Sequence, residues 1–250
     1  MRLAVVSDIH SNLEALEAVL WDTKNLGIDT VVSLGDNIGY GADPEAVIRL
    51  LGQHKVESVI GNHELALLEP TYLEAFHPPA RQALLINKRL LSQKSLAHIR
   101  SFQISLVRQG CLFVHGLPPD SVTTYLSRTS DKKLGLIMAH MDQQISFVGH
   151  THQLEVVRLD RGRVTRSKIE KKVLFLDKGS RYIINAGSVG QPRKSTLDAK
   201  YLVFDPDLYC VEPRVVGYDR ASAAKKIRKA GIPEGFALQL VQPSNQERSL

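Results

Sequence analysis

Leu3-Ala4-Val5-Val6-Ser7-Asp8-Ile9-His10 is the stretch that decides the fold, because it joins a short apolar run directly to an aspartate and a histidine. Four later segments repeat this arrangement, each with an apolar run followed by Asp, Asn or His. The five polar fragments are Asp8-Ile9-His10, Gly35-Asp36, Gly61-Asn62-His63, His115-Gly116 and Gly149-His150-Thr151-His152. Open α/β folds place their chemistry just beyond the carboxyl ends of strands, so we expect these side chains along one edge of a sheet.

The apolar run before each fragment predicts a strand, and the segments between the first runs predict helices. The five strands are expected at residues 3–6, 30–34, 56–60, 111–114 and 145–148. Ser11-Asn12-Leu13-Glu14 predicts a capping box at the start of a helix that ends near Gly27. A second helix is expected from Pro44 to Leu51. This β-α-β-α-β order predicts right-handed crossovers and a parallel sheet.

The rest of the chain predicts further helices, and after residue 154 it predicts mainly short strands. Helices are expected at residues 72–76, 80–91, 131–141 and 221–229, and a hairpin turn at residues 107–110. Short β-type runs at 155–159, 164–169, 173–176, 182–185, 201–204 and 211–216 predict an antiparallel second sheet. We expect one domain over residues 1–240 and a polar, disordered tail over residues 241–250.

The composition predicts a globular protein of the cytoplasm. Hydrophobic residues make up 43% of the chain, which is enough for a core, and no apolar stretch approaches the roughly 20 residues that span a bilayer. We therefore expect no membrane association. Met1-Arg2-Leu3 enters the first strand at once and is too short for a signal peptide. The two cysteines, Cys111 and Cys210, form no disulfide framework, which favours a reducing cytoplasm.

The formal net charge is +6, because 32 Lys and Arg residues face 26 Asp and Glu residues. A basic surface attracts phosphorylated small molecules and nucleic acids. Much of the excess lies in two late stretches, residues 158–172 and 220–229. No aromatic residues interleave these charges as stacking platforms for bases would require, so solvated surface is the favoured interpretation. We do not expect specific nucleic-acid binding.

The ligand types in the five fragments favour a divalent metal site. Residues i and i+2 of an extended segment point the same way, so Asp8 and His10 can bind one cation together, and His150 and His152 can serve one cluster. Carboxylate oxygen and imidazole nitrogen suit borderline metals such as Zn, Fe or Mn. The absence of thiolates argues against a structural zinc. Each fragment alone is common in proteins without a metal, so the prediction of a metal site rests on the five fragments together.

The series of fragments resembles the calcineurin-like metallophosphoesterase superfamily, whose pattern is D-x-H, G-D, G-N-H-[DE], a lone H and G-H-x-H. Every element is present in order. Residues 35–41 and 187–193 are similar to the small bacterial and archaeal branch of that superfamily. The resemblance covers essentially the whole chain. It implies an α/β fold with a four-layer αββα sandwich of two mixed sheets.

The resemblance also implies roles for individual residues. One metal ion would be held by Asp8, His10 and His152, the other by Asn62, His115 and His150, and Asp36 would bridge the two. The cofactors would be two divalent ions of Mn, Fe, Zn, Ni or Co. His63 would be catalytic, protonating the leaving oxygen or stabilising the transition state. The position of Glu64, directly after His63, suits it to orient His63 or to cap the next helix. From its place after Gly190-Gln191-Pro192, Arg193 is a candidate substrate-binding residue that reaches a phosphate oxygen.

These features predict a metal-dependent phosphoric ester hydrolase with a small phosphorylated substrate. A metal-bridging hydroxide would attack phosphate mono- or diesters of small molecules or nucleotides. The same site would serve a dinucleoside polyphosphate hydrolase, a nuclease or a phosphoprotein phosphatase, and the motifs do not choose among them. A non-catalytic scaffold is disfavoured, because such a protein is expected to lose ligands or the His63 position.

Overall fold

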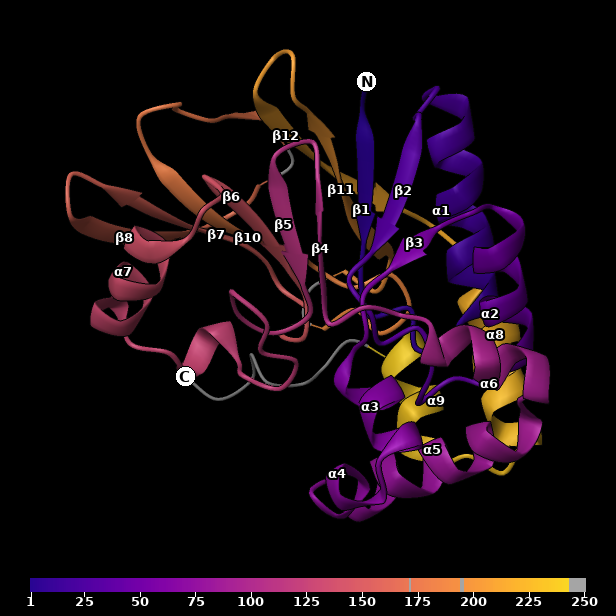
Figure 1. Ribbon diagram of the computed structural model, residues 1–250. Coiled ribbons are helices and arrows are strands. Elements are labelled where there is room, and N and C mark those ends of the chain that lie inside the picture. Colours follow the sequence, from indigo (N-terminus) through magenta and orange to yellow (C-terminus); the bar gives the residue numbers. More distant parts are fainter. Residues whose placement is uncertain (171, 194–195, 243–250) are drawn as a thin grey trace.

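The described residues form two six-stranded β-sheets packed face to face (Figure 1). This computed structural model of the chain describes residues 1–170, 172–193 and 196–242. The first sheet has the order β3 (Glu57–Ser58), β2 (Thr30–Ser33), β1 (Leu3–Val6), β11 (Ala199–Asp205), β12 (Cys210–Val216) and β9 (Leu174–Phe175). The second has the order β4 (Ser105–Arg108), β5 (Cys111–Val114), β6 (Ile145–Val148), β10 (Arg181–Ala186), β7 (Leu154–Asp160) and β8 (Arg163–Lys168).

Both sheets are mixed, as predicted. Strands β1, β2 and β3 are parallel, and β11 runs antiparallel beside β1. In the second sheet, β10 is parallel to β6 and antiparallel to β7. The prediction that the late strands form an antiparallel sheet of their own is wrong. They divide instead, because β11 and β12 extend the first sheet from β1 while β10, β7 and β8 extend the second from β6.

Helices cover the outer face of each sheet and complete a four-layer sandwich (Figure 1). On the side of the first sheet lie α1 (Leu13–Asn25), α2 (Pro44–Gln53), α3 (Asn62–Leu68), α4 (Pro70–Glu74), α5 (Pro78–Leu90), α6 (Gln93–Arg100), α8 (Arg220–Lys229) and α9 (Glu234–Val241). Helix α7 (Asp131–His140) packs on β7, β8 and β10 of the second sheet, and the short 3-10 helix η1 (Leu126–Arg128) precedes it. None of the helices in these ranges has the length and apolar composition needed to span a bilayer.

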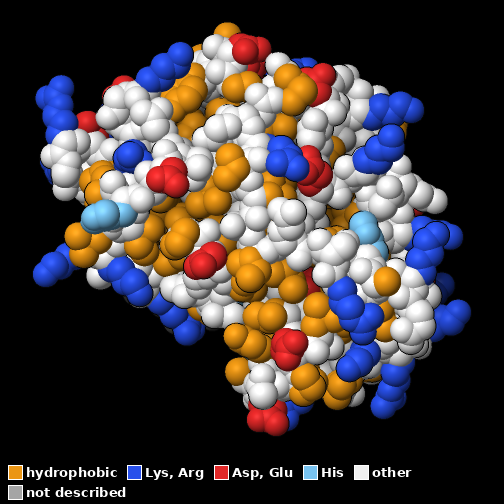
Figure 2. Space-filling view, in the orientation of Figure 1, with side chains coloured by type: hydrophobic (Ala, Val, Ile, Leu, Met, Phe, Trp, Pro, Cys, Tyr) orange, Lys and Arg blue, Asp and Glu red, His pale blue; other side chains and the backbone are white. Residues whose placement is uncertain are grey.

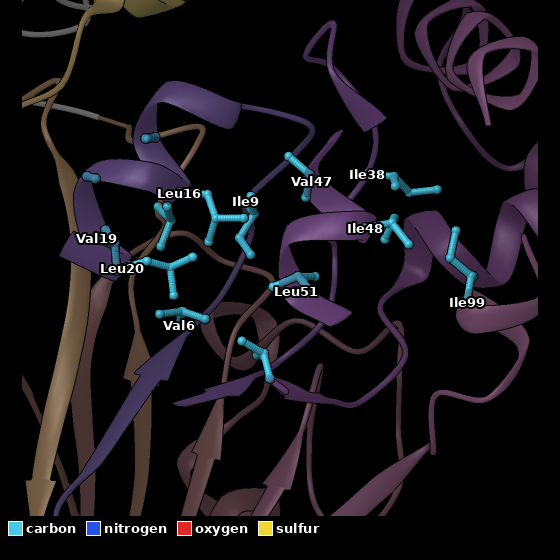
Figure 3. Close-up of a cluster of buried hydrophobic side chains, with 14 of the residues drawn as sticks. Val6, Ile9, Leu16, Val19, Leu20, Ile38, Val47, Ile48, Leu51 and Ile99 are labelled. Atoms are coloured by element: carbon cyan, nitrogen blue, oxygen red, sulfur yellow. The ribbon is translucent and has the colours of Figure 1, made fainter. Parts of the chain in front are cut away.

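The side chains of β1 alternate between two cores, as the period of a strand requires. Leu3 and Val5 enter the core between the sheets, where the rings of Phe113 and Phe147 stack with centroids 5.2 Å apart. Ala4 and Val6 face the opposite way, into the core beneath α1 and α2. Figure 3 shows this second core, where Val6 and Ile9 meet residues of both helices. Burial on both faces fixes β1 in place, and therefore also the loop that follows it.

Several expected boundaries differ in the structure. The predicted capping box at Ser11 is wrong: Asn12 caps α1 by accepting a hydrogen bond from the backbone N–H of Ala15, and Ser11 donates to Asn87 instead. Strand β3 is shorter than expected: the Val59 N–H still donates to the Ser33 carbonyl of β2, but Val59 forms its own bridge with Gln103, ahead of β4.

Two further differences lie at turns and at the end of the chain. The turn predicted at residues 107–110 is only Gln109-Gly110, both with positive φ, since Val107 and Arg108 belong to β4. Helix α9 was not expected, because Gly231 and Pro233, which precede its eight residues, are typical of the end of a helix. Most of the predicted disordered tail, residues 243–250, lies outside the described residues.

Lys55, just after α2, offers a test of backbone strain. It is exposed and has φ of 52°, a left-handed conformation that costs an L-residue roughly 1–2 kcal/mol. We expect Lys55→Gly to raise the free energy of unfolding by about 0.5–1 kcal/mol, since glycine adopts this conformation freely but loses chain entropy. Denaturant unfolding measures the change. The control Gln53→Gly, inside α2, should lower the free energy of unfolding, and a decrease for Lys55→Gly would refute the strain argument.

Candidate metal centre

The structure brings together the seven residues predicted as metal ligands. They come from loops after β1, β2, β3, β5 and β6, and so from corresponding ends of both sheets. The expectation of a single sheet edge is therefore wrong. The two sheets meet along the core between them, so the carboxyl ends of their parallel strands open onto the same region (Figure 1). The candidate site lies there, at the junction of the two sheets.

The first group of donors is Asp8, His10 and His152, all buried. Asp8 Oδ1 lies 3.1 Å from His152 Nε2 and 3.7 Å from His10 Nε2. The two Nε2 atoms are 3.3 Å apart. Asp8 Oδ2 is already occupied, because it accepts hydrogen bonds from the Ser7 hydroxyl at 2.6 Å and from the His150 backbone N–H at 3.1 Å. Oδ1 has no hydrogen-bond partner and is therefore free to bind a cation.

The second group contains Asp36, His115 and His150, with Asn62 beside them. Asn62 Oδ1 lies 3.0 Å from His115 Nε2. Asp36 Oδ2 lies 3.4 Å from His115 Nε2 and 3.8 Å from His10 Nε2, which belongs to the first group. Asp36 therefore stands between the two groups, where a bridging ligand must be.

Backbone carbonyls fix the orientation of the imidazole rings. Three Nδ1 atoms each lie against a carbonyl oxygen: His10 with Ile38 at 3.1 Å, His115 with Leu34 at 2.7 Å and His152 with Gln191 at 2.8 Å. A carbonyl can only accept, so Nδ1 carries a proton in each ring and Nε2 faces the other donors. His150 is reversed, because its Nε2 lies 3.2 Å from the Thr123 carbonyl, so Nδ1 would be the nitrogen that binds a metal.

Five of the seven predicted ligands have a left-handed backbone. The φ angles are 53° for Asp8, 50° for His10, 53° for Asp36, 68° for His150 and 59° for His152. The expectation that the i and i+2 pairs converge through extended backbone is therefore wrong, although the side chains do converge. Such conformations cost roughly 1–3 kcal/mol each and cluster at functional sites, where the surroundings hold them. The concentration of strain supports a binding role for this region.

Glycines allow the two central loops to touch. Gly35 has φ of 88°, and a Cβ there would lie 2.4 Å from the Gly61 nitrogen. Gly61 has a negative φ, so close packing and not backbone conformation requires a glycine there. A Cβ on Gly61 would lie 2.2 Å from the Asp36 nitrogen, and only glycine permits this approach. The loops that carry Asp36 and Asn62 are thereby held against each other.

Electrostatics favour the protonation states that ligands need. Burial raises the pKa of Asp8 and of Asp36, but the surrounding imidazoles lower both pKa values more strongly, so the two carboxyl groups stay ionised. Burial lowers the pKa of His10, and lowers the pKa of His150 to about 3, which keeps these imidazoles neutral.

His115 is the exception among these imidazoles. Burial lowers its pKa, but attraction to Asp36 and a hydrogen bond to it outweigh burial and raise the pKa to about 9. A proton on His115 therefore occupies the position that a metal ion would take. Ionised carboxylates, neutral imidazoles and an unpartnered buried carboxylate oxygen together fit divalent cations.

His63 lies beside the donors at the start of α3. Its backbone N–H donates to Asp36 Oδ1 at 2.8 Å, and its Nε2 lies 3.8 Å from Asp36 Oδ2, so it also falls within reach of a metal at Asp36. Its ring packs edge-on to Tyr40 and Phe76, with centroids 4.6 and 4.8 Å away. Burial is the largest cause that lowers its pKa to about 4. The imidazole is therefore neutral near pH 7 in the metal-free protein.

Glu64 organises the loop that carries Asp36. One of its carboxylate oxygens accepts from the backbone N–H groups of Asp36 and Gly61 at 2.9 Å each, and the other accepts from Asn37 at 2.6 Å and Ile38 at 3.2 Å. Glu64 caps α3, which was one of its two predicted roles. It also joins the loop that carries Asp36 to the loop that carries Asn62. Burial and the charge of Asp36 raise the pKa of Glu64 to about 7, while the N–H donors act in the opposite direction.

We expect Glu64→Gln to lower the free energy of unfolding of the metal-free protein by about 2–3 kcal/mol. The amide would turn an N–H₂ group toward backbone donors and leave buried N–H groups unpaired. Denaturant unfolding at neutral pH gives the value. Glu74→Gln, at an exposed position of α4, is the matched control and should change stability by no more than about 0.5 kcal/mol. Equal values for the two variants would show that Glu64 does not hold the loops.

Among the described residues, Arg193 forms no hydrogen bond or ion pair with a predicted ligand. Its side chain is exposed. Burial raises the pKa of Tyr40 and of Tyr125, and the Arg193 guanidinium lowers both, which places its charge near the two phenols. Tyr125 itself was missed by sequence reasoning: its ring stacks on His150 with centroids 3.8 Å apart. It belongs to no motif, so a single sequence carries no signal for it.

The fold and the donor set define a class of proteins, the phosphoesterases of a metal-dependent family. The chain belongs to the calcineurin-like phosphoesterase superfamily, whose domain model matches residues 1–207. This confirms the resemblance and the four-layer α/β fold.

Individual relatives cover nearly the whole chain. An uncharacterized protein of Methanocaldococcus jannaschii is 34% identical over 243 residues, which are 95% of this chain and 96% of that protein. The crystal structure of a metallophosphoesterase from Sphaerobacter thermophilus is 35% identical with a TM-score of 0.84, covering 96% of this chain and 98% of the other. A hypothetical protein from Pyrococcus horikoshii, 19% identical with a TM-score of 0.77, covers 96% and 97% and shares the fold.

Proposed function

We propose that this protein is a two-metal hydrolase of phosphate mono- or diesters of small molecules or nucleotides. The observation that carries the proposal is the position of Asp36 Oδ2, 3.4 Å from His115 Nε2 in one donor group and 3.8 Å from His10 Nε2 in the other. Asp8, His10 and His152 would hold one ion, and Asn62, His115 and His150 the other. Such a pair of ions supplies an acidified water and neutralises charge on a bound phosphate.

The protein's own residues supply orientation and a hydrogen-bond donor. The carbonyls of Ile38, Leu34 and Gln191 hold three imidazoles with Nε2 facing inward, so the donors need little rearrangement. His63 is neutral near pH 7 and lies against Asp36. We infer that its N–H donates to the leaving oxygen as negative charge develops there. Arg193, whose side chain is exposed, would pair with a phosphate oxygen of the incoming substrate.

The basic stretches give little support to a nucleic-acid substrate, because several of their charges are paired within the protein. Arg158 Nη2 lies 2.7 Å from Asp177, and Arg166 Nε lies 2.7 Å from Asp131. In the second stretch, Lys226 and Arg228 also form ion pairs. Figure 2 shows Lys and Arg side chains spread around the edge of the visible face, with acidic side chains among them. Because these charges are paired within the protein, they favour a small substrate over a nucleic acid.

The test is a substrate panel assayed with defined metals. Metal-free protein is reloaded with Mn, Ni, Co, Mg or Zn and given phosphomonoesters, phosphodiesters, dinucleoside polyphosphates, phosphopeptides and DNA. The proposal expects metal-dependent hydrolysis of a small ester that persists at physiological salt. Strand cleavage with salt-resistant binding would establish a nuclease instead, and preference for phosphopeptides would establish a protein phosphatase. No turnover with any metal would contradict the proposal.

A further inference from the structure

Helices α8 and α9 lie beyond residues 1–207, which the family model matches, yet they pack beside the metal centre. Lys226 of α8 forms ion pairs with Glu14 of α1 at 2.7 Å and with Asp43 at 2.9 Å, ahead of α2. Apolar residues of both helices form one buried cluster with Ala80 and Ala83 of α5. The pair is therefore fixed against three helices of the family domain.

One side chain of α9 reaches the candidate site through a single aromatic ring. Phe236 is 7% exposed and stacks on Tyr40, with centroids 4.5 Å apart and ring planes 26° from parallel. The Tyr40 ring in turn lies 4.4 Å from the ring of His10 and 4.6 Å from that of His63. Tyr40 is thus wedged between α9 and two histidines, of which one is a proposed ligand and the other the proposed hydrogen-bond donor.

The backbone of Tyr40 requires such support. Its φ is 59°, and it follows Gly39 at 93°, so the loop after Asp36 takes a conformation that a bulky residue rarely adopts. A strained conformation persists only when surrounding contacts over-determine it. The ring of Phe236 is one of those contacts. Its removal would let the Tyr40 ring move and widen the range of His10 and His63 orientations.

A second contact runs from α9 to another ligand. Gln239 accepts a hydrogen bond from the side-chain amide of Gln191. Gln191 is buried, and its backbone carbonyl lies 2.8 Å from His152 Nδ1. The carbonyl that fixes the His152 ring therefore belongs to a residue that α9 holds. This contact does not pass through Tyr40, and it reaches His152, a different member of the first donor group.

We propose that α9 is a positioning element of the metal centre. Phe236 acts through Tyr40 on His10 and His63, and Gln239 acts through Gln191 on His152. The part that concerns metal affinity rests on the donor geometry, and the part that concerns turnover rests on the proposed function. Removal of partners that orient ligands typically costs about 10–100-fold in metal affinity or activity.

The first experiment is a double-mutant cycle with Phe236→Leu and Tyr40→Leu in the full chain. Metal affinity is measured by competition of Mn²⁺ with a chelator, and stability by unfolding of the metal-free protein. We expect Phe236→Leu alone to weaken Mn²⁺ binding by about 10-fold or more. In the Tyr40→Leu background it should add less than about twofold, because its effect passes through that ring. Tyr40→Phe, which keeps the ring, should retain wild-type affinity.

Ile232→Val, in the same apolar cluster, is the control for loss of packing alone. Ile232→Val should leave Mn²⁺ affinity unchanged, even if it lowers the stability of the metal-free protein as much as Phe236→Leu does. Affinity that falls equally in both variants, or losses that add in full in the cycle, would overturn the proposal for Phe236. These readouts need no turnover, so a failure of the proposed function would show separately as absence of activity in the wild-type protein.

The second experiment compares two residues of similar length at position 239. Gln239→Glu keeps an oxygen that accepts from Gln191, whereas Gln239→Met does not. We expect Gln239→Met to weaken Mn²⁺ binding severalfold and Gln239→Glu to remain within about twofold of the wild type. Wild-type affinity in Gln239→Met would remove Gln239 from the positioning element.

Where the wild type hydrolyses an ester, Phe236→Leu should lower kcat with little change in KM.

Discussion

Asp36→Asn should abolish binding of the pair of metal ions and lower kcat/KM by about 10³-fold or more, because several kcal/mol of charge stabilisation depends on both ions. Asp36 Oδ2 lies within 3.8 Å of His10, His63 and His115, and its other oxygen accepts the His63 backbone N–H. Asparagine preserves the shape and can preserve that hydrogen bond, so the fold should persist. The loss follows from the missing negative charge between the two donor groups.

Metal content and initial rates should be measured on one preparation of the Asp36→Asn variant. Asp142→Asn, at an exposed position before β6, is the matched control and should keep both metal content and rate. Denaturant unfolding of the metal-free proteins checks that the variant is folded. A folded Asp36→Asn protein that binds two ions and turns over normally would remove Asp36 from the bridging position.

His63→Ala should retain metal and lose about 10²–10⁴-fold in kcat. The reason is that Asn62, His115 and His150 complete the second donor group without His63, while the imidazole N–H acts on the leaving oxygen. Substrates with good leaving groups should be affected less, since they need less stabilisation of the departing oxygen. Rates with a series of aryl phosphate esters measure this dependence directly.

The position of His63 also allows another role, that of a metal ligand. His63 Nε2 lies 3.8 Å from Asp36 Oδ2, within reach of a metal held there. If His63→Ala loses an ion together with its activity, His63 is a ligand and the proposed division of roles is wrong. His54→Ala, at an exposed position after α2, controls for the loss of an imidazole and should behave as the wild type.

The strands that precede the ligands could be predicted because their signal is local. Strands β1, β5 and β6 match the apolar runs before Asp8, His115 and His150 residue for residue. The partnership of the late strands could not be predicted in this way. Whether β10 lies beside β6 and β11 beside β1 depends on contacts between residues far apart in the chain, and strand propensity says nothing about them.

For the candidate site as well, local features could be predicted from the sequence and long-range features could not. The identities of the donors follow from short motifs, which place the right side-chain chemistry after each strand. Their convergence depends on backbone that no motif predicts, since Asp8 and His10 are left-handed where extended backbone was expected. The contacts of Phe236 with Tyr40 and of Gln239 with Gln191 join distant parts of the chain, so they became visible only in the folded protein.

The most direct test of the two-metal account is anomalous diffraction at the manganese absorption edge from crystals of the Mn²⁺-loaded protein. The account predicts two peaks per chain about 3.5–4 Å apart with Asp36 between them. One peak should lie beside Asp8, His10 and His152, and the other beside Asn62, His115 and His150. A single peak per chain in fully loaded protein, or two peaks away from Asp36, would contradict the account.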